Sequence, residues 1–399
     1  MFIHRAAFFV YIWFYVIILE VKSMGKHTDF LYLSEPEVIE AGVYDAKFCV
    51  DNAEEVFKLI AKGDYVMGGP NHNSHGIYVT FPKEPEFENM PKDGPDRRFV
   101  AMPAYLGGRF DMAGCKWYGS NAGNKDHGLP RSILMTMLND KETGEPICHL
   151  SGNLISAART GAVPGVGVRH LARKDSEVLT LIGCGAIGKS SLQNIIGEMP
   201  NIKKVICHNH SEARAIALAE YCTKTYGVEA VVENDLETAT RQADVLNVAA
   251  SRTVPLIFKH EWIKPGCTIL ASGPLNGDEE FWMQMKVIWD NHKLHEAYVE
   301  DAIISGDKEA FYKTVIGGPV FHLIDEGKKP ALDAPESVNI GDVINGTKVG
   351  RESDDQIICF IASGQVIFDI ALAHDLYQNA LKKGLGTKLL LWDSPAQAD

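Results

Sequence analysis

The stretch that decides the fold is LTLIGCGAIGKSSL, residues 179–192. It contains the spacing G-x-G-x-x-G, with an apolar run before the glycines and a helix-forming run after them. In such a turn the first glycine permits a tight bend, the second lets the backbone approach a pyrophosphate, and the third lets the helix pack on the strand. The candidate cofactor-binding residues of this turn are Gly183, Gly185, Ala186, Ile187 and Gly188. The stretch therefore predicts a strand, a turn and a helix that bind a dinucleotide through its phosphates.

The same letters also fit G-x-x-x-x-G-K-[ST], the phosphate loop of nucleoside triphosphate sites, with Lys189 as its lysine. The flanking chain separates the two interpretations. Strand-like and helix-like runs alternate across residues 175–291, and no strand there ends in a carboxylate that stands out as a magnesium ligand. This alternation predicts a doubly wound parallel sheet and favours the dinucleotide.

The choice of cofactor depends on the end of the second strand, which reads VICHNHSEAR. A site for NAD usually has an aspartate or glutamate there, which binds the ribose hydroxyls. The side chains found instead are Asn209, His210, Ser211 and Arg214. The missing acid and the nearby cationic groups favour NADP, although NAD stays open because asparagine can also accept a ribose hydroxyl. After the fourth strand, Ser251 and Arg252 are predicted to lie beside the nicotinamide half.

Composition limits the partners of this chain of 399 residues. Its formal net charge of -13 argues against nucleic acid, whose phosphates would be repelled. The eight cysteines form no C-x-x-C pair, so they are predicted to be free thiols in a reducing compartment. His208 and His210 lack a third candidate ligand nearby, and we expect no metal site.

The first residues form an unusual segment, because residues 5–21 are almost entirely apolar. A membrane anchor, a secretory signal and sequence upstream of a start at Met24 are three possible interpretations. The apolar run is short for a membrane span, and no small-residue cleavage site follows it. We therefore favour the start at Met24 and a cytoplasmic protein, with membrane anchoring or secretion as the alternatives.

The flanks of the central region have a different pattern. Short apolar runs separated by glycine turns predict a mixed, largely antiparallel sheet before residue 151. NLISAARTGAVPGVGVRHLAR predicts a helix pair interrupted around Pro164. Near the C-terminus, QIICFIASG predicts a strand that leads into a long helix. The fold class expected from these patterns is α/β.

The motifs MPAYLGG, GCKWYGS, LNDKETGEPI, LISAARTGA, LIGCGAIG and DDQIICFIASGQVIFDIALA occur in this order across residues 30–391. Together they resemble the ornithine cyclodeaminase/mu-crystallin family. GRESDDQIIC and LGTKLLL are most similar to its opine-type amino-acid dehydrogenase branch, whose named member makes a diaminopropionate precursor for siderophores. The resemblance implies a Rossmann domain over residues 151–319. It also implies a substrate-binding and dimerisation domain from residues 24–150 and 320–399, with residues 1–23 as an extension.

The resemblance further implies hydride transfer between a nicotinamide and the α-carbon of an amino acid, an opine-type secondary amine or a cyclic imine. Lys116 matches the active-site lysine of the family, and Arg159 matches the arginine that holds the substrate carboxylate. Both residue types suit these roles, since guanidinium binds carboxylate in a bidentate manner and a lysine of lowered pKa can transfer protons. Arg98 is a further candidate anion contact, and Ser363 lies in the segment expected to close over the cofactor.

Two departures from the family pattern affect the expected reaction. A carboxylate-binding Arg or Lys is replaced in the segment VMGGPNHNSHG, where His72 is the candidate substitute. Leu275 stands where cyclodeaminases have an aspartate, and Asp278 is the nearest candidate for its catalytic role. Ornithine cyclodeaminase, which converts ornithine to proline and ammonia with recycled NAD, is therefore the alternative enzyme. A non-catalytic crystallin-like binder is the alternative of another class, and Lys116 and Arg159 favour catalysis over it. The expected partners are a small-molecule amino-acid or imine substrate and a second copy of the chain in a homodimer.

Overall fold

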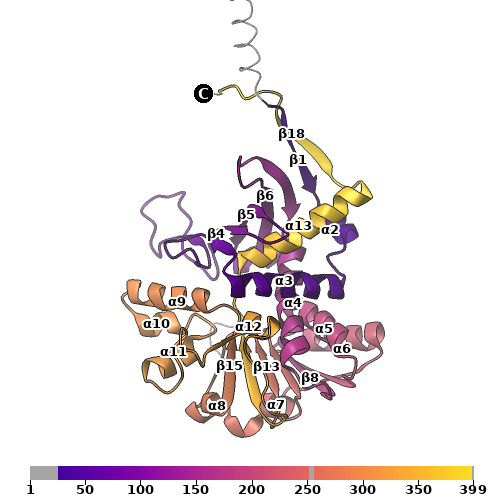
Figure 1. Ribbon diagram of the computed structural model, residues 1–399, viewed down its shortest axis with the longest axis vertical. Coiled ribbons are helices and arrows are strands. Elements are labelled where there is room, and N and C mark those ends of the chain that lie inside the picture. Colours follow the sequence, from indigo (N-terminus) through magenta and orange to yellow (C-terminus); the bar gives the residue numbers. More distant parts are fainter. Residues whose placement is uncertain (1–25, 251–255, 398–399) are drawn as a thin grey trace, which may run out of the picture.

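The computed structural model describes residues 26–250 and 256–397. The expectations for residues 1–23 and for Ser251 and Arg252 lie outside the described residues. Two eight-stranded sheets, joined and covered by helices, form most of the molecule (Figure 1). The small third sheet pairs β12 (Leu256–Phe258) with β14 (Leu275–Gly277).

The parallel sheet has the strand order β10-β9-β8-β11-β13-β17-β15-β16. Its strands are β8 (Val178–Ile182), β9 (Lys204–His208), β10 (Glu229–Val232), β11 (Val245–Val248), β13 (Thr268–Ala271), β15 (Met285–Trp289), β16 (Val338–Asn339) and β17 (Ile357–Ile361). Every pair within it is parallel. The order reverses between β8 and β11, which is where dinucleotides bind in doubly wound sheets. The predicted Rossmann architecture is confirmed.

Helices cover the parallel sheet on both sides (Figure 1). They are α5 (Ala186–Glu198), α6 (Glu212–Tyr226), α7 (Leu236–Arg241), α8 (Glu279–Met283), α9 (His292–Ile304), α10 (Lys308–Tyr312), α11 (Gly318–Asp325) and α12 (Ile340–Ile344). The strands between them are almost fully buried, as expected for a parallel sheet enclosed by helices.

The other sheet has the order β18-β1-β7-β6-β5-β4-β2, with β3 paired to β4. Its strands are β1 (Thr28–Leu33), β2 (Tyr65–Met67), β3 (Ile77–Thr80), β4 (Arg98–Leu106), β5 (Met112–Ser120), β6 (Ser132–Asn139), β7 (Pro146–Ser151) and β18 (Thr387–Trp392). Only β1 and β7 pair in parallel, so the predicted mixed and largely antiparallel sheet is confirmed. Strands from both chain ends meet in it, since β18 pairs with β1.

Four helices connect the two sheets: α2 (Glu35–Ala41), α3 (Ala46–Lys62), α4 (Asn153–Leu171) and α13 (Val366–Lys383). The expected helix pair around Pro164 is wrong, because α4 is one continuous helix with Pro164 inside it. Two glycines let α4 lie against its neighbours: a methyl group at Gly161 would lie 2.2 Å from Ser190 Oγ, and one at Gly165 would lie 2.7 Å from Val50 Cγ2. Close packing on both sides maintains the helix despite the backbone donor lost at the proline.

The sheets do not follow the expected boundary between residues 319 and 320. Strands β16 and β17 lie beyond it, yet both pair within the parallel sheet. We therefore propose that the Rossmann domain includes β17, and that the chain returns to the substrate-binding and dimerisation domain near the start of α13. No helix in residues 26–250 and 256–397 is long and apolar enough to cross a membrane. All eight cysteines are free, as predicted.

Candidate active site

The turn between β8 and α5 forms an open cradle. Gly183 has φ 105°, and a methyl group there would lie 2.7 Å from the nitrogen of Ala250. A methyl group at Gly188 would lie 1.9 Å from the carbonyl oxygen of Gly183, so helix and strand pack too closely for any side chain. Gly185, by contrast, has nothing within 4 Å of that position, and Ala186 beside it is exposed. The free backbone at the start of α5 therefore fits a pyrophosphate.

Lys189 does not serve this cradle in the manner of a phosphate-loop lysine. Its Nζ lies 4.1 Å from the ring centroid of Tyr221 on α6, a cation–π contact. In a triphosphate site the lysine would instead reach toward the phosphates. The position of Lys189 thus supports the dinucleotide interpretation of the glycine turn.

The residue that follows β9 is hydrogen-bonded to the glycine turn between β8 and α5. Asn209 Oδ1 accepts a hydrogen bond from the backbone N–H of Cys184 at 3.1 Å, and its Nδ2 donates to the carbonyl oxygen of Ser211 at 2.9 Å. Asn209 is therefore used to hold the cradle together. His210, Ser211 and Arg214 are exposed around the start of α6.

A buried cationic cluster lies between β5, α4 and α13. Lys116 on β5 is only 3% exposed. Its Nζ donates to Asp369 Oδ1 at 2.9 Å and to Ser156 Oγ at 2.8 Å. Burial lowers the pKa of Lys116 to about 8, and the positive charge of Arg159 acts in the same direction, while Asp369 opposes both. An amine with this pKa exchanges protons near neutral pH.

Arg159 on α4 completes the cluster. Its Nε lies 3.0 Å from Asp369 Oδ2, so one carboxylate on α13 faces both cations. Two cations against one carboxylate leave an excess positive charge in a dry site. Such a site attracts a second anion, which a substrate carboxylate can supply. The structure thus brings together the two residues that the sequence singled out, 43 positions apart.

Arg98, at the start of β4, is more exposed than the Lys116–Asp369–Arg159 cluster. Its Nη1 lies 2.8 Å from Asp96 Oδ1, and its guanidinium carbon lies 5.8 Å from the ring centroid of Tyr78. Tyr118 follows the cluster along β5, with the Nζ of Lys116 5.8 Å from its ring centroid. Burial raises the pKa of Tyr78 to about 12 and that of Tyr118 as well, so both phenols are neutral.

The loop between β2 and β3 places a different histidine at the cluster from the one expected. His72 is exposed in a turn at φ 59°, whereas His75 lies against the carboxyl end of β17. The Nδ1 of His75 is 2.6 Å from the carbonyl oxygen of Gly364. Burial is the main cause that lowers the pKa of His75 to about 4; the hydrogen bond to Gly364 opposes it, and the charges of Arg159 and Lys116 act in the same direction as burial.

A buried carboxylate holds the segment that follows β17. Asp290 Oδ2 accepts from the backbone N–H of Ser363 at 2.7 Å and from Gln365 Nε2 at 3.0 Å. Its other oxygen lies 2.8 Å from His295 Nε2. Ser363 therefore sits in a fixed turn at the carboxyl edge of the parallel sheet. The glycine cradle lies at this same edge, which fits the cofactor contact predicted for Ser363.

Asp278 lies in another setting. It caps the short helix α8 by accepting from the backbone N–H of Phe281 at 2.6 Å, and its Oδ2 is 3.2 Å from His260 Nδ1. Among residues 26–250 and 256–397, no hydrogen bond or ion pair joins it to Lys116 or Arg159. Its catalytic role stays a prediction, without a contact that supports it.

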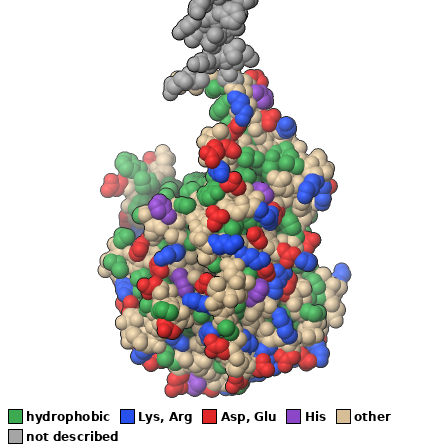
Figure 2. Space-filling view, viewed as in Figure 1, with side chains coloured by type: hydrophobic (Ala, Val, Ile, Leu, Met, Phe, Trp, Pro, Cys, Tyr) green, Lys and Arg blue, Asp and Glu red, His purple; other side chains and the backbone are tan. Residues whose placement is uncertain are grey.

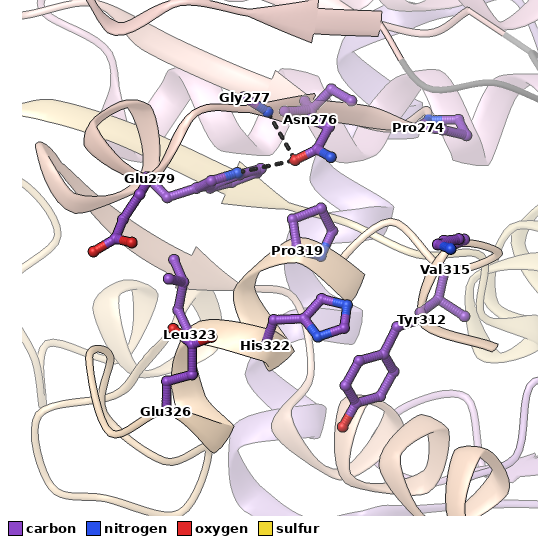
Figure 3. A pocket seen from close by; sticks show the side chains of 13 residues that line it. Pro274, Asn276, Gly277, Glu279, Tyr312, Val315, Pro319, His322, Leu323 and Glu326 are labelled. Atoms are coloured by element: carbon purple, nitrogen blue, oxygen red, sulfur yellow. Dashed lines mark hydrogen bonds between the residues drawn. The ribbon is translucent and has the colours of Figure 1, made fainter. Parts of the chain in front are cut away.

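A cavity of about 290 Å³ lies beside that segment, between β14, α8, α10 and α11. Figure 3 shows Asn276 with its two hydrogen bonds, across from Pro319 and His322 of α11. Asn276 Oδ1 accepts from the backbone N–H of Gly277 at 2.8 Å and from Trp282 Nε1 at 3.4 Å. Neither Lys116 nor Arg159 lines this cavity. It is therefore separate from the cationic cluster.

Sequence reasoning missed Asp369 and His75. A sequence signal did exist for Asp369, because VIFDIALA places one acid in an otherwise apolar stretch, and a buried acid needs a partner. His75 had no such signal, since NHNSH offers two histidines of equal appearance and only the path of the loop separates them.

The glycine cradle, the parallel sheet and the buried lysine–arginine–aspartate cluster define a Rossmann-fold protein with a second, mixed sheet that supplies part of the site. The family model of the ornithine cyclodeaminase/mu-crystallin family matches residues 44–384. The chain belongs to this family, as its motifs indicated.

Two curated relatives and one solved structure illustrate the family. N-((2S)-2-amino-2-carboxyethyl)-L-glutamate dehydrogenase of Staphylococcus aureus is 27% identical over 368 residues, which cover 91% of this chain and 99% of the relative. Delta(1)-pyrroline-2-carboxylate reductase of Bacillus cereus is 32% identical over 268 residues, 67% of this chain and 77% of the relative. An archaeal alanine dehydrogenase dimer with bound NAD has a TM-score of 0.71 at 29% identity, covering 92% of this chain and all of that one.

Proposed function

We propose that this protein is an NAD(P)-dependent oxidoreductase that acts on the C–N bond of an amino acid, an opine-type secondary amine or a cyclic imine. The observation that carries the proposal is the buried Lys116–Asp369–Arg159 cluster at a site that also includes the turn after β17. All three relatives described above are named for reactions at such a bond or for NAD. A nicotinamide dinucleotide in the glycine cradle would accept or donate the hydride.

The protein's own residues bind the substrate and move protons. Arg159 binds the substrate carboxylate, because its guanidinium faces one acid and the cluster carries excess positive charge. Lys116 accepts the proton released when an amine is oxidised to an imine and returns it in the reverse direction. Asp369 orients Lys116 and Arg159 and lowers the cost of burying two cations.

The experiment is a panel of amines, imines and pairs of a 2-oxo acid with an amine, each tested with NAD and NADP. A net change in reduced nicotinamide, detected by its absorbance, supports the proposal. Proline and ammonia formed from ornithine without net reduced cofactor would instead identify a cyclodeaminase. Tight cofactor binding without any turnover would identify a crystallin-like binder.

We further propose that the cofactor is NADP in preference to NAD. Asn209 already accepts from Cys184 and donates to Ser211, and it lacks the pair of acceptor oxygens with which an acid binds both ribose hydroxyls. The exposed Arg214 and the Ser211 hydroxyl, at the start of α6, offer a place for a 2′-phosphate.

Replacing Arg214 with alanine is expected to weaken NADP binding about tenfold and to leave NAD binding unchanged, because only NADP carries the phosphate that this cation binds. Dissociation constants measured by fluorescence titration check it. Lys224→Ala, at the far end of the same helix, is the matched control. A parallel loss for both cofactors would contradict the preference.

We also propose that the protein is a homodimer in the cytoplasm, where its free thiols stay reduced. The outer face of the mixed sheet is apolar: a groove of about 620 Å³ is lined by Phe81, Phe99, Trp117, Ile133, Met135 and neighbours. Figure 2 shows hydrophobic side chains gathered around the hollow at upper left, over the region where Figure 1 places β4, β5 and β6. A patch of this kind fits a second copy, as in the dimeric structure described above.

Met135→Glu is expected to turn the dimer into a monomer, because it places a charge beside Trp117, its cross-strand partner in the centre of the face. Analytical ultracentrifugation at micromolar concentration measures the outcome. Ile304→Glu on α9 introduces the same charge at another exposed apolar residue, and that variant should remain dimeric. A dimer that tolerates Met135→Glu would place the interface elsewhere.

A further inference from the structure

His75 is the least explained group at the cluster. Its Nδ1 lies 2.6 Å from the carbonyl oxygen of Gly364, and a carbonyl can only accept. Nδ1 therefore carries the hydrogen, which fixes the tautomer of the neutral ring. Nε2 is then an acceptor, and it has no hydrogen-bond or ion-pair partner in the part of the chain that the structure describes.

The position of the ring places this acceptor next to the carboxylate-binding group. A methyl group built at Gly364 would lie 3.0 Å from His75 Cε1 and 3.6 Å from Arg159 Nη2, so the imidazole and the guanidinium flank the same point. The ring of Tyr78 stacks on that of His75 with 6.5 Å between centroids, and the tilted ring of Tyr298 lies 6.2 Å from it. Because both groups flank this point, we expect an α-amino acid whose carboxylate contacts Arg159 to present its nitrogen to the imidazole.

The charges around His75 define what it can bind. Arg159, and Lys116 while it is protonated, are donors without acceptor capacity, and Asp369 already faces both of them. A substrate nitrogen that carries hydrogen therefore needs another acceptor at this place. Of the acids around the ring stack, Asp290 accepts from Ser363 and Gln365, and Glu300 accepts from Asn71. Burial, and after it the charge of Asp301 on α9, raises the pKa of Tyr78 and Tyr298 and keeps both phenols neutral.

We propose that His75 is a specificity-determining residue, whose Nε2 accepts a hydrogen bond from the N–H of the substrate nitrogen while Arg159 holds the carboxylate. This inference rests on the proposed function and names what the same site recognises. Substrates that carry N–H at the α-carbon are bound, and isosteres with an acceptor atom at that position are rejected. The Nδ1 bond to Gly364 keeps the ring in the orientation that this requires.

Two substitutions at position 75 test the roles of Nδ1 and Nε2 separately. Asparagine at position 75 can still donate to Gly364 but has nothing at the place of Nε2, whereas glutamine carries an amide oxygen near that place. If the ring only supports the turn, His75→Asn behaves as wild type. If Nε2 binds substrate, His75→Asn raises KM about 30-fold with a smaller change in kcat, and His75→Gln regains part of the loss.

A binding measurement tests the proposal without turnover. L-Proline and tetrahydrofuran-2-carboxylate, which has an ether oxygen in place of the N–H, are added to the full-length protein with NADPH, and the melting temperature is recorded. Wild type should be stabilised more by proline; His75→Asn should lose this difference while its ligand-free melting temperature stays unchanged. His127→Asn, at an exposed histidine, is the control and keeps the difference.

The outcomes distinguish this proposal from the function on which it rests. Equal stabilisation of wild type by both probes, stabilisation by neither, or an unchanged difference in His75→Asn would overturn the role of His75. A panel in which no amine changes the nicotinamide absorbance would overturn the proposed function instead. The binding result with NADPH would still decide the role of His75.

Discussion

Lys116→Ala is expected to lower kcat/KM by about 1000-fold, because it removes the buried amine that we propose exchanges a proton with the substrate nitrogen. Lys116→Met should have the same effect while it keeps most of the side-chain volume. Ser156→Ala removes only one hydrogen-bond partner of Nζ, and a loss of about tenfold or less is expected. Steady-state kinetics with the best amine of the panel measure all three.

The proposed role of Lys116 also predicts in which direction kcat/KM changes with pH. Amine oxidation needs Lys116 as a proton acceptor, so kcat/KM should rise with pH and level off above the lysine pKa of about 8. Imine reduction needs the protonated lysine, so its rate should fall as the pH rises through the same value. Lys116→Met should lose this ionisation in both directions. A variant that keeps full activity, or the same pH profile, would remove Lys116 from the mechanism.

Gly185→Val is expected to weaken dinucleotide binding about 100-fold or more without changing stability. The side chain would extend into open space where the pyrophosphate approaches the backbone, and charged hydrogen bonds of this kind contribute roughly 1.5–3 kcal/mol each. The backbone at Gly185, with φ -87°, is accessible to other residues, so the fold does not require glycine there. Isothermal titration and thermal denaturation measure the two effects.

Gly188→Ala is the matched variant in the same turn. Its methyl group would meet the carbonyl oxygen of Gly183 at 1.9 Å, so the helix must move and the free energy of unfolding should fall by about 1–3 kcal/mol. Gly185→Val and Gly188→Ala therefore distinguish a glycine that the ligand requires from a glycine that helix–strand packing requires. Undiminished cofactor affinity in Gly185→Val would contradict the cradle.

The sequence predicted the parallel sheet and its cradle well, because their signals are local. A strand, three glycines at fixed spacing and a helix stand next to one another in residues 178–198. Lys116 and Arg159 could be identified for a similar reason, since each lies inside a family motif. Pro164 misled the helix prediction because tertiary packing on α4 overrides a local breaker.

The rest of the site depends on contacts between distant parts of the chain. Asp369 meets Lys116 across 253 positions, and His75 meets Gly364 across 289. Periodicity and residue spacing report only on neighbours in the sequence, so they cannot predict contacts between residues this far apart. The same limit affects Asp278, whose position in the sequence suggested a catalytic acid but whose side chain caps α8.

The central claim is hydride transfer at the α-carbon, and a deuterium label tests it most directly. The best amine of the panel, labelled at its α-carbon, is incubated with the protein and oxidised cofactor, and the reduced cofactor is analysed by mass spectrometry. We predict one deuterium per reduced nicotinamide formed, in proportion to imine or 2-oxo acid produced. Reduced cofactor that carries no deuterium, with the label lost to water or kept in the organic product, would contradict the claim.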